Sequence, residues 1–219
     1  MNTYFKTPPL VINLLIINVL VFMAQYFLPE ATSNSMTDLF ALHFWQSSYF
    51  QPWQLLTYMF MHGGWEHLFF NMFALWMFGR ILEYDLGNRR FLIFYLVCGV
   101  GAALIQLGVN WIEVAMVKRE LIGNPMLIGK LLQMVDVPTV GASGAIFGVL
   151  LAFGMLHPND RIMLIFPPIP MKAKYFVIGY GVLELVIGVA NPGSAVAHFA
   201  HVGGMLWGLL LLWYWKKKR

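Results

Sequence analysis

The sequence predicts an all-α membrane protein, a six-transmembrane-helix bundle that forms a single domain over residues 1–219. Composition is the first observation behind this prediction, because 59% of the residues are apolar and 11% are charged, whereas soluble domains carry about 25% charged residues. The second is a mean hydropathy of +0.68, which a water-solvated surface does not explain. The third is the grouping of apolar residues into runs close to the ~20 residues that cross a bilayer.

The predicted transmembrane segments cover residues 9–28, 53–79, 91–111, 141–157, 173–190 and 196–215. The first apolar run is too long for a signal peptide and lacks a convincing small-residue cleavage site, so it is interpreted as a span. Its retention gives an even number of spans, which places the two termini on the same side of the membrane.

The connections between the spans differ in character. Residues 29–52 contain no Lys or Arg but several aromatic residues, which is typical of a loop in the membrane interface. Residues 112–139 mix Gly and Pro with apolar residues and predict a short amphipathic helix on the outer face. The prolines of Phe166-Pro-Pro-Ile-Pro170 predict a turn between the fourth and fifth spans, and Asn191-Pro-Gly-Ser194 predicts a tight outer turn before the sixth.

The positions of the basic residues predict that both termini are cytoplasmic. With the N-terminus inside, 11 of the 14 Lys and Arg residues lie on the cytoplasmic side, as the positive-inside rule requires. These are Lys6, Arg80, Arg89, Arg90, Arg161, Lys172, Lys174, Lys216, Lys217, Lys218 and Arg219. We therefore expect a multi-pass protein of the cell (inner or plasma) membrane, in contact with the lipid bilayer. The basic residues flank apolar runs and form no stripe, so no nucleic-acid partner is expected.

Ser143 is the candidate nucleophile. It lies in Gly141-Ala-Ser143-Gly144 at the start of the fourth span, which is short and begins below the outer surface. Irregular backbone at that depth is tolerated where protein or a water-filled cavity surrounds it, and a hydrolase needs water as its second substrate. His201 is the candidate base, because a serine needs a group that accepts its proton.

Two features of the sequence predict that Ser143 and His201 lie close together: their similar depth in the membrane, and small residues on the spans that carry them. At ~1.5 Å per residue, Ser143, His201 and His67 all lie roughly 20–22 Å above the predicted inner ends of their spans. Small-residue strips on the fourth and sixth spans allow two helices to approach closely. These strips are Gly144 with Gly148 and Gly204 with Gly208.

The predicted catalytic unit is a Ser143–His201 dyad. No acidic residue stands at a spacing that indicates a third member, so packing is expected to hold the imidazole, with Phe147 stacked on it one turn after Ser143. His67 and Asn71, at positions i and i+4 of the second span, are expected to donate hydrogen bonds to the oxyanion together with the Ser143 amide.

Each of these features has a simpler explanation when it stands alone. A serine between glycines in a membrane helix usually serves helix packing, and a single intramembrane histidine is often structural or part of a proton path. A transporter that uses His67, His201 and Glu184 as a proton relay would show inverted repeats, and the sequence has none. The α/β-hydrolase fold is excluded because Ala145 replaces the last glycine of its motif and no strand precedes Ser143.

Together the motifs resemble those of the rhomboid intramembrane serine proteases. The similarity runs from about Gln51 to Gly208, and its motifs are the following: His62-Gly-Gly-Trp-Glu-His67 with Asn71, Gly79-x-x-x-Glu83-x-x-x-Gly87, Gly141-Ala-Ser143-Gly144, and Ala200-His201-x-x-Gly204-x-x-x-Gly208. The resemblance implies the same six-helix bundle, Ser143 as nucleophile and His201 as base. It further implies single-span transmembrane substrates, cut near their outer membrane boundary after lateral entry past the fifth span and residues 191–197. It implies neither a metal nor an organic cofactor.

The resemblance leaves several points open. Trp45 is followed by Gln46, where many bacterial members have arginine, so the anchoring of the first outer loop is not predicted. Glu83 is expected to have a structural role, whereas Glu184 is expected to face protein and either bond within the bundle or tune the gate. His198 is interpreted as a residue at the cavity mouth. The alternative function is a non-catalytic rhomboid-like binder of transmembrane clients; such binders lack the serine or the histidine, and this chain has both.

Overall fold

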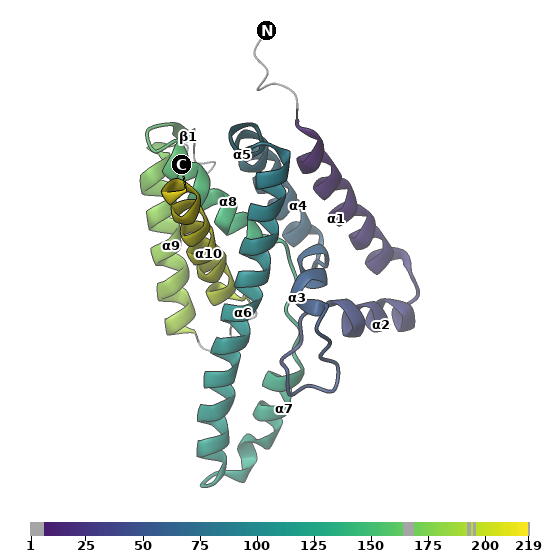
Figure 1. The fold of residues 1–219 in the computed structure, drawn as a ribbon. Coiled ribbons are helices and arrows are strands. Elements are labelled where there is room, and N and C mark those ends of the chain that lie inside the picture. The colour runs from purple at the N-terminus through teal and green to yellow at the C-terminus, as the bar shows by residue number, and fades with distance from the viewer. Residues whose placement is uncertain (1–6, 164–168, 192–193, 195, 219) are drawn as a thin grey trace.

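The computed structural model describes residues 7–163, 169–191, 194 and 196–218. This part of the chain is a bundle of helices with one short hairpin of strands (Figure 1). The elements are α1 (Pro9–Phe27), α2 (Glu30–Phe40), α3 (Gln54–Thr57), η2 (Tyr58–Phe60), α4 (Trp65–Ala74), η3 (Leu75–Gly79), α5 (Arg80–Leu86), α6 (Asn88–Leu121), η4 (Pro125–Leu127), α7 (Ile128–Asp136), α8 (Ser143–Leu156), β1 (Arg161–Met163), β2 (Pro170–Lys172), α9 (Ala173–Ala190) and α10 (His198–Lys217).

Three helices of the described chain are long and apolar enough to cross a membrane. These are α1, α6 and α9, and α8 is a shorter apolar helix. The first residue of α1 and the last residues of α10 lie at one end of the bundle, beside α5 and β1, whereas α2 and α7 lie at the other end (Figure 1). The predicted helical, multi-pass membrane fold is confirmed to this extent, apart from the short hairpin of β1 and β2.

The second predicted span, residues 53–79, has the wrong limits. Residues 53–64 form α3, the single 3₁₀ turn η2 and a non-helical link, and the long helix begins only at Trp65. Gly64 has a φ of 163° and a ψ of 172°, an extended backbone that ends the link before the helix. The helix then continues through the π-helical segment η3 into α5 and ends at Gly87, whose φ of 76° favours glycine.

Two predicted loops contain more helix than expected. Residues 29–52 include α2, an 11-residue helix without a buried residue. Helix α6 has 34 residues and reaches Leu121, so it extends well beyond the predicted limit of 111. Helix α7 lies within residues 112–139 and confirms the short helix predicted there.

The two predicted turns lie partly outside the described residues. Strands β1 and β2 pair antiparallel before α9, with Arg161 opposite Lys172 and Ile162 opposite Met171. The proline-rich turn over 166–170 falls mainly on residues that the structure does not describe. In the second turn, the N–H of Ser194 donates to the carbonyl oxygen of Asn191 at 3.1 Å.

Helix α10 packs against α6 and α8 through glycines. A Cβ on Gly204 would overlap the carbonyl oxygen of Gly144, and a Cβ on Gly208 would lie 3.4 Å from the Cα of Gly148. The backbones of α8 and α10 are therefore in direct contact, as the two small-residue strips predict.

Glu83 joins α1 to the bundle. Its carboxylate, 1% exposed, accepts the backbone N–H groups of Leu10 at 3.0 Å and Val11 at 2.8 Å. These N–H groups belong to the first turn of α1, where no helical partner exists. The structural role expected for Glu83 is confirmed, with a backbone partner from another helix.

Candidate active site

Ser143 is the first residue of α8, at the end of an extended segment. The segment is fixed by hydrogen bonds from the N–H of Gly141 to the carbonyl of Tyr58 at 3.0 Å, and between Leu42 and Thr139. Gly141 has a φ of 125°, a conformation that side chains rarely adopt. A Cβ there would also lie 2.8 Å from the His67 ring. Glycine at position 141 therefore lets α4 and the start of α8 meet.

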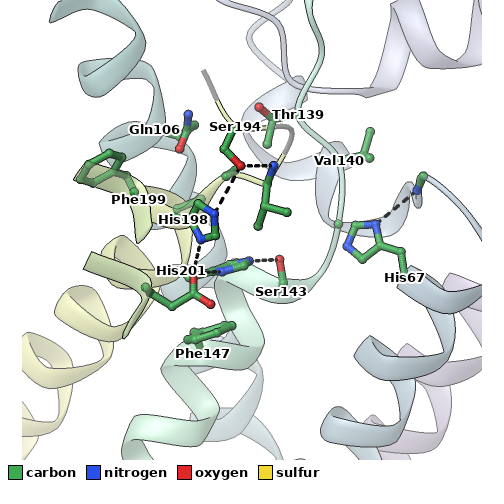
Figure 2. Close-up of a pocket in the computed structure, with 18 of the residues that line it drawn as sticks. His67, Gln106, Thr139, Val140, Ser143, Phe147, Ser194, His198, Phe199 and His201 are labelled. Carbon is green, nitrogen blue, oxygen red and sulfur yellow. Dashed lines mark hydrogen bonds and ion pairs between the residues drawn. The ribbon is translucent and has the colours of Figure 1, made fainter. Parts of the chain in front are cut away.

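The side chains of Ser143 and His201 are in direct contact. The distance between Ser143 Oγ and His201 Nε2 is 2.8 Å, which is a hydrogen bond. The ring of Phe147 stacks on the imidazole of His201, with centroids 4.2 Å apart and planes 4° apart. Figure 2 shows the Ser143 hydroxyl pointing toward His201, with Phe147 below the imidazole. Both contacts are those that the sequence predicts.

His67 lies near Ser143, on the side away from His201 (Figure 2). Its Nδ1 accepts the backbone N–H of Gly63 at 3.3 Å. A neutral imidazole whose Nδ1 accepts carries its proton on Nε2. This nitrogen is one of the two ring atoms that face Gly141. The ring thus presents an N–H donor on the side of the Ser143 segment.

Asn71 is buried in the same helix, with 6% of its surface exposed. Its Nδ2 donates to the carbonyl oxygen of His67 at 2.7 Å, so one of its two N–H groups is already bonded. The other N–H group has no partner within the part of the chain that the structure describes. Among the described residues, neither His67 nor Asn71 bonds to Ser143 directly, but all three line one cavity.

The sequence predicts that no acidic residue contacts the serine–histidine pair. This prediction is wrong, because the carboxylate of Glu184 contacts the imidazole of His201. Oε2 of Glu184 lies 2.8 Å from Nδ1 of His201 and 2.7 Å from Nδ1 of His198. Helices α9 and α10 are antiparallel neighbours, so residues before and after their turn face each other. His198 is 8% exposed and lines the cavity, and it is also a buried partner of this carboxylate. The expectation that Glu184 faces protein is confirmed.

The cavity around these residues has a volume of about 1690 Å³. Helices α4, α6, α7, α8, α9 and α10 all contribute to its lining, as does the segment before Ser143. Asn110, Lys130 and Asn191 add polar groups to a mostly apolar wall. A cavity of this kind admits both water and an extended peptide.

One group within the described residues has the donor types of a metal site. Ligand atoms of Glu184, His198 and His201 lie within 4.8 Å of one another. Their closest contacts, at 2.7 and 2.8 Å, are hydrogen-bond distances. Each Nδ1 that donates to Glu184 carries a proton and has no lone pair for a metal. The absence of a metal remains a prediction.

The loop within residues 29–52, which the sequence predicts to be the first outer loop, is anchored without an arginine. Oε1 of Gln46 accepts a hydrogen bond from Nζ of Lys118 at 2.8 Å, which joins the loop to α6. The side chain of Gln54 is fully buried and donates to the carbonyls of Asp38 and Tyr49. These two glutamines hold the loop that precedes the α4 region.

Fold and site together define a multi-pass helical membrane protein with a serine–histidine pair beside a large cavity. Residues 49–218 match the Rhomboid domain, and the chain therefore belongs to the rhomboid family. This family includes intramembrane serine proteases, which act on transmembrane substrates within the lipid bilayer.

Relatives match almost the whole chain. It is 31% identical over 217 residues to Rhomboid protein 1, mitochondrial, of Saccharomyces cerevisiae, which covers 98% of this chain and 56% of that protein. It is 26% identical over 220 residues to Rhomboid-like protein 11, chloroplastic, of Arabidopsis thaliana, which covers 93% of this chain and 64% of the relative. Rhomboid protease AarA of Providencia stuartii is 28% identical over 212 residues, which cover 92% of this chain and 70% of AarA.

Proposed function

We propose that this protein is an intramembrane serine endopeptidase that cleaves transmembrane segments near their outer membrane boundary. In this proposal, Ser143 Oγ attacks the peptide carbonyl carbon while His201 Nε2 takes the serine proton. The main support for this proposal is the 2.8 Å contact between Ser143 Oγ and His201 Nε2. The pair lies beside a cavity, and Phe147 stacks on the imidazole.

The oxyanion of the tetrahedral intermediate is proposed to bind to three donors. They are Nε2–H of His67, the free amide N–H of Asn71 and the backbone N–H of Ser143. The last lies at the first position of α8, where backbone N–H groups have no helical partner and the helix dipole favours an anion. The acceptor role of His67 Nδ1 supports the first donor, because it leaves the proton on Nε2.

The glycines support this geometry by setting distances. Gly141 allows His67 to approach, while Gly144 and Gly204 let α8 and α10 touch, with Gly208 continuing the contact. Neither a metal, an organic cofactor nor a nucleic acid takes part in the proposed reaction. Water is the second substrate and reaches Ser143 through the cavity.

We further propose that residues 1–219 form one domain with six spans and both termini on the cytoplasmic side. The spans correspond to α1, the continuous helix of α4, η3 and α5, then α6, α8, α9 and α10. The clustering of Lys and Arg at one end supports this orientation. Single-span substrates would enter laterally past α9 and residues 191–197, because α9 has few buried residues.

The proposed location is the cell membrane. The Providencia stuartii relative supports it, whereas two similar relatives are named as mitochondrial and chloroplastic. Fractionation of the native cells followed by protease protection of each terminus decides between these membranes and tests the orientation.

The test of the activity uses detergent-solubilised or reconstituted protein and a fluorophosphonate probe, which reacts with activated serines. We expect Ser143→Ala to abolish labelling and His201→Ala to lower its rate on the order of 10³-fold or more, because members of such a unit act together. Cleavage of a single-span transmembrane substrate is expected to fail in both variants, with unchanged thermal unfolding. Labelling that survives Ser143→Ala removes Ser143 as nucleophile, and labelling without cleavage of any transmembrane substrate favours a non-proteolytic role.

A further inference from the structure

A second polar network lies behind the serine–histidine pair. One carboxylate oxygen, Oε2 of Glu184, contacts Nδ1 of His201 at 2.8 Å and Nδ1 of His198 at 2.7 Å. The three side chains belong to residues that are only 6% to 9% exposed. Buried charges need partners, because an unpaired carboxylate is costly away from water. Whether this carboxylate is satisfied therefore depends on which nitrogen atoms of the two imidazoles carry protons.

The proton positions follow from the acceptors. An ionised carboxylate oxygen only accepts, so each of the two Nδ1 atoms must donate. Each imidazole then has a lone pair on Nε2. For His201 this lone pair faces Ser143 Oγ, and for His198 it faces Ser194 Oγ at 3.3 Å. Ser194 Oγ in turn accepts the N–H of Val196 at 3.1 Å, so every contact has one donor and one acceptor.

Stacking alone does not prepare His201 as a base. Phe147 contacts the face of the imidazole and fixes its plane. It does not distinguish Nδ1 from Nε2 and does not decide which nitrogen carries the proton. A hydrogen-bond acceptor at Nδ1 does both, because it selects the tautomer whose Nε2 can accept a proton from serine.

We propose that Glu184 is a positioning residue for His201, the third member of a Ser143–His201–Glu184 unit that His198 braces from the other side. This rests on the proposed function. When the serine proton moves to His201 Nε2, the imidazole becomes a cation and Glu184 stabilises it without taking the proton, as in other serine enzymes with a third acidic member. His198 and Ser194 tie the same carboxylate to the segment between α9 and α10.

Glu83 provides a matched control within the chain. It is also a buried glutamate whose carboxylate accepts two N–H groups, but these belong to the backbone of α1. A role that is only structural predicts similar behaviour for both residues. The proposal predicts that Glu83→Gln changes stability and leaves kcat per folded molecule unchanged.

The experiment measures kcat, KM and fluorophosphonate labelling in reconstituted membranes for variants at position 184. Glu184→Gln removes the charge, and Glu184→Leu also removes the hydrogen-bond acceptor. Glu184→Asp retains both on a side chain that is one methylene shorter. We expect kcat to fall on the order of 10²-fold or more in the Gln and Leu variants, with KM nearly unchanged and partial recovery in the Asp variant. Thermal unfolding shows whether each variant is folded.

A second readout does not need activity. Nitrogen-15 NMR of histidine-labelled protein reports the tautomer of each ring, and assignment uses His201→Gln and His198→Gln. We expect both rings to carry the proton on Nδ1 in the native chain and His201 to lose this preference in Glu184→Leu. Retained kcat within about threefold in both the Gln and Leu variants, or an Nε2-protonated His201 in the native chain, overturns the proposal.

These outcomes distinguish a failure of the proposed function from a failure of the positioning role of Glu184. If Ser143→Ala retains labelling, the proposed function fails, and the tautomer measurement still decides whether Glu184 sets the state of His201. If labelling depends on Ser143 but not on Glu184, only the positioning role fails.

Discussion

Helix α10 meets α8 and α9 in opposite ways. Against α8 the contact is between backbones, since Gly204 lies on the carbonyl of Gly144. Against α9 it is made by side chains, among them the carboxylate of Glu184 with two imidazoles. Ten of the 14 residues of α8 are buried, but only four of the 18 residues of α9. The two helices that carry the candidate nucleophile and base are thus locked together, while the third is held at few points.

The difference indicates how rigidity is distributed around the site. A contact between backbones has no adjustable atoms, so it fixes the separation of Ser143 and His201. Side-chain contacts can break and re-form with little change elsewhere, so α9 is the helix expected to move. Single substitutions in α8, α9 and α10 compare these two contacts directly.

Gly204→Ala is expected to have the largest effect. The added methyl group overlaps the carbonyl of Gly144, and the helices must separate because no flexible side chain can yield. Overpacking of this kind costs about 1–3 kcal/mol of unfolding free energy. Denaturant unfolding in micelles measures the loss, and fluorophosphonate labelling is expected to fall at the same time. Native stability and labelling in this variant would contradict the backbone contact.

Phe147→Leu is expected to have an intermediate effect, because Phe147 stacks on His201 of α10 and also on Tyr180 of α9 at 5.2 Å. Stacking contributes about 0.5–1.5 kcal/mol, which corresponds to a labelling rate lowered by about 2- to 10-fold. Phe153→Leu is the control, since Phe153 is buried in the same helix but stacks on His157. Equal losses of labelling in the two variants would show that the ring on His201 has no special role.

Gly179→Ala is expected to have the smallest effect. The substitution is the same as at Gly204, but nothing lies within 4 Å of the new methyl group on α9. Stability is expected to stay within about 0.5 kcal/mol of the native chain, with any gain due to the better helix propensity of alanine. The same unfolding and labelling assays apply. A loss as large as that of Gly204→Ala would mean that α9 is as tightly packed as α8.

The pairing of Ser143 with His201 could be predicted because it depends on quantities that the sequence records. Rise per residue gives the depth of each side chain, and the glycine strips give the faces that touch. The partner of Glu184 could not be predicted in the same way. Helix α9 is apolar on all sides, so no periodicity tells which face meets α10. The signal that the sequence did contain was the presence of an ionisable residue, Glu184, within an apolar span, because such residues usually have a functional role.

The limits of the second span were missed for a different reason. Residues 53–61 are mostly apolar, and apolar runs alone do not distinguish a helix from a buried loop. Gly63 and Gly64 marked the true beginning, since glycines interrupt helices. Helix α6 was underestimated because its last three turns carry Glu113, Lys118, Arg119 and Glu120, which hydropathy excludes although a helix accommodates them outside lipid.

The 14 residues of α8 give it a length of ~21 Å, against a hydrocarbon layer of ~30 Å. The proposed scissile bond must therefore descend several ångströms below the headgroups before it reaches the serine. Hydrophobic mismatch then becomes a control on turnover, because longer acyl chains deepen that descent whereas shorter ones reduce it. A protease of this design would respond to the thickness of its membrane as well as to the sequence of its substrate.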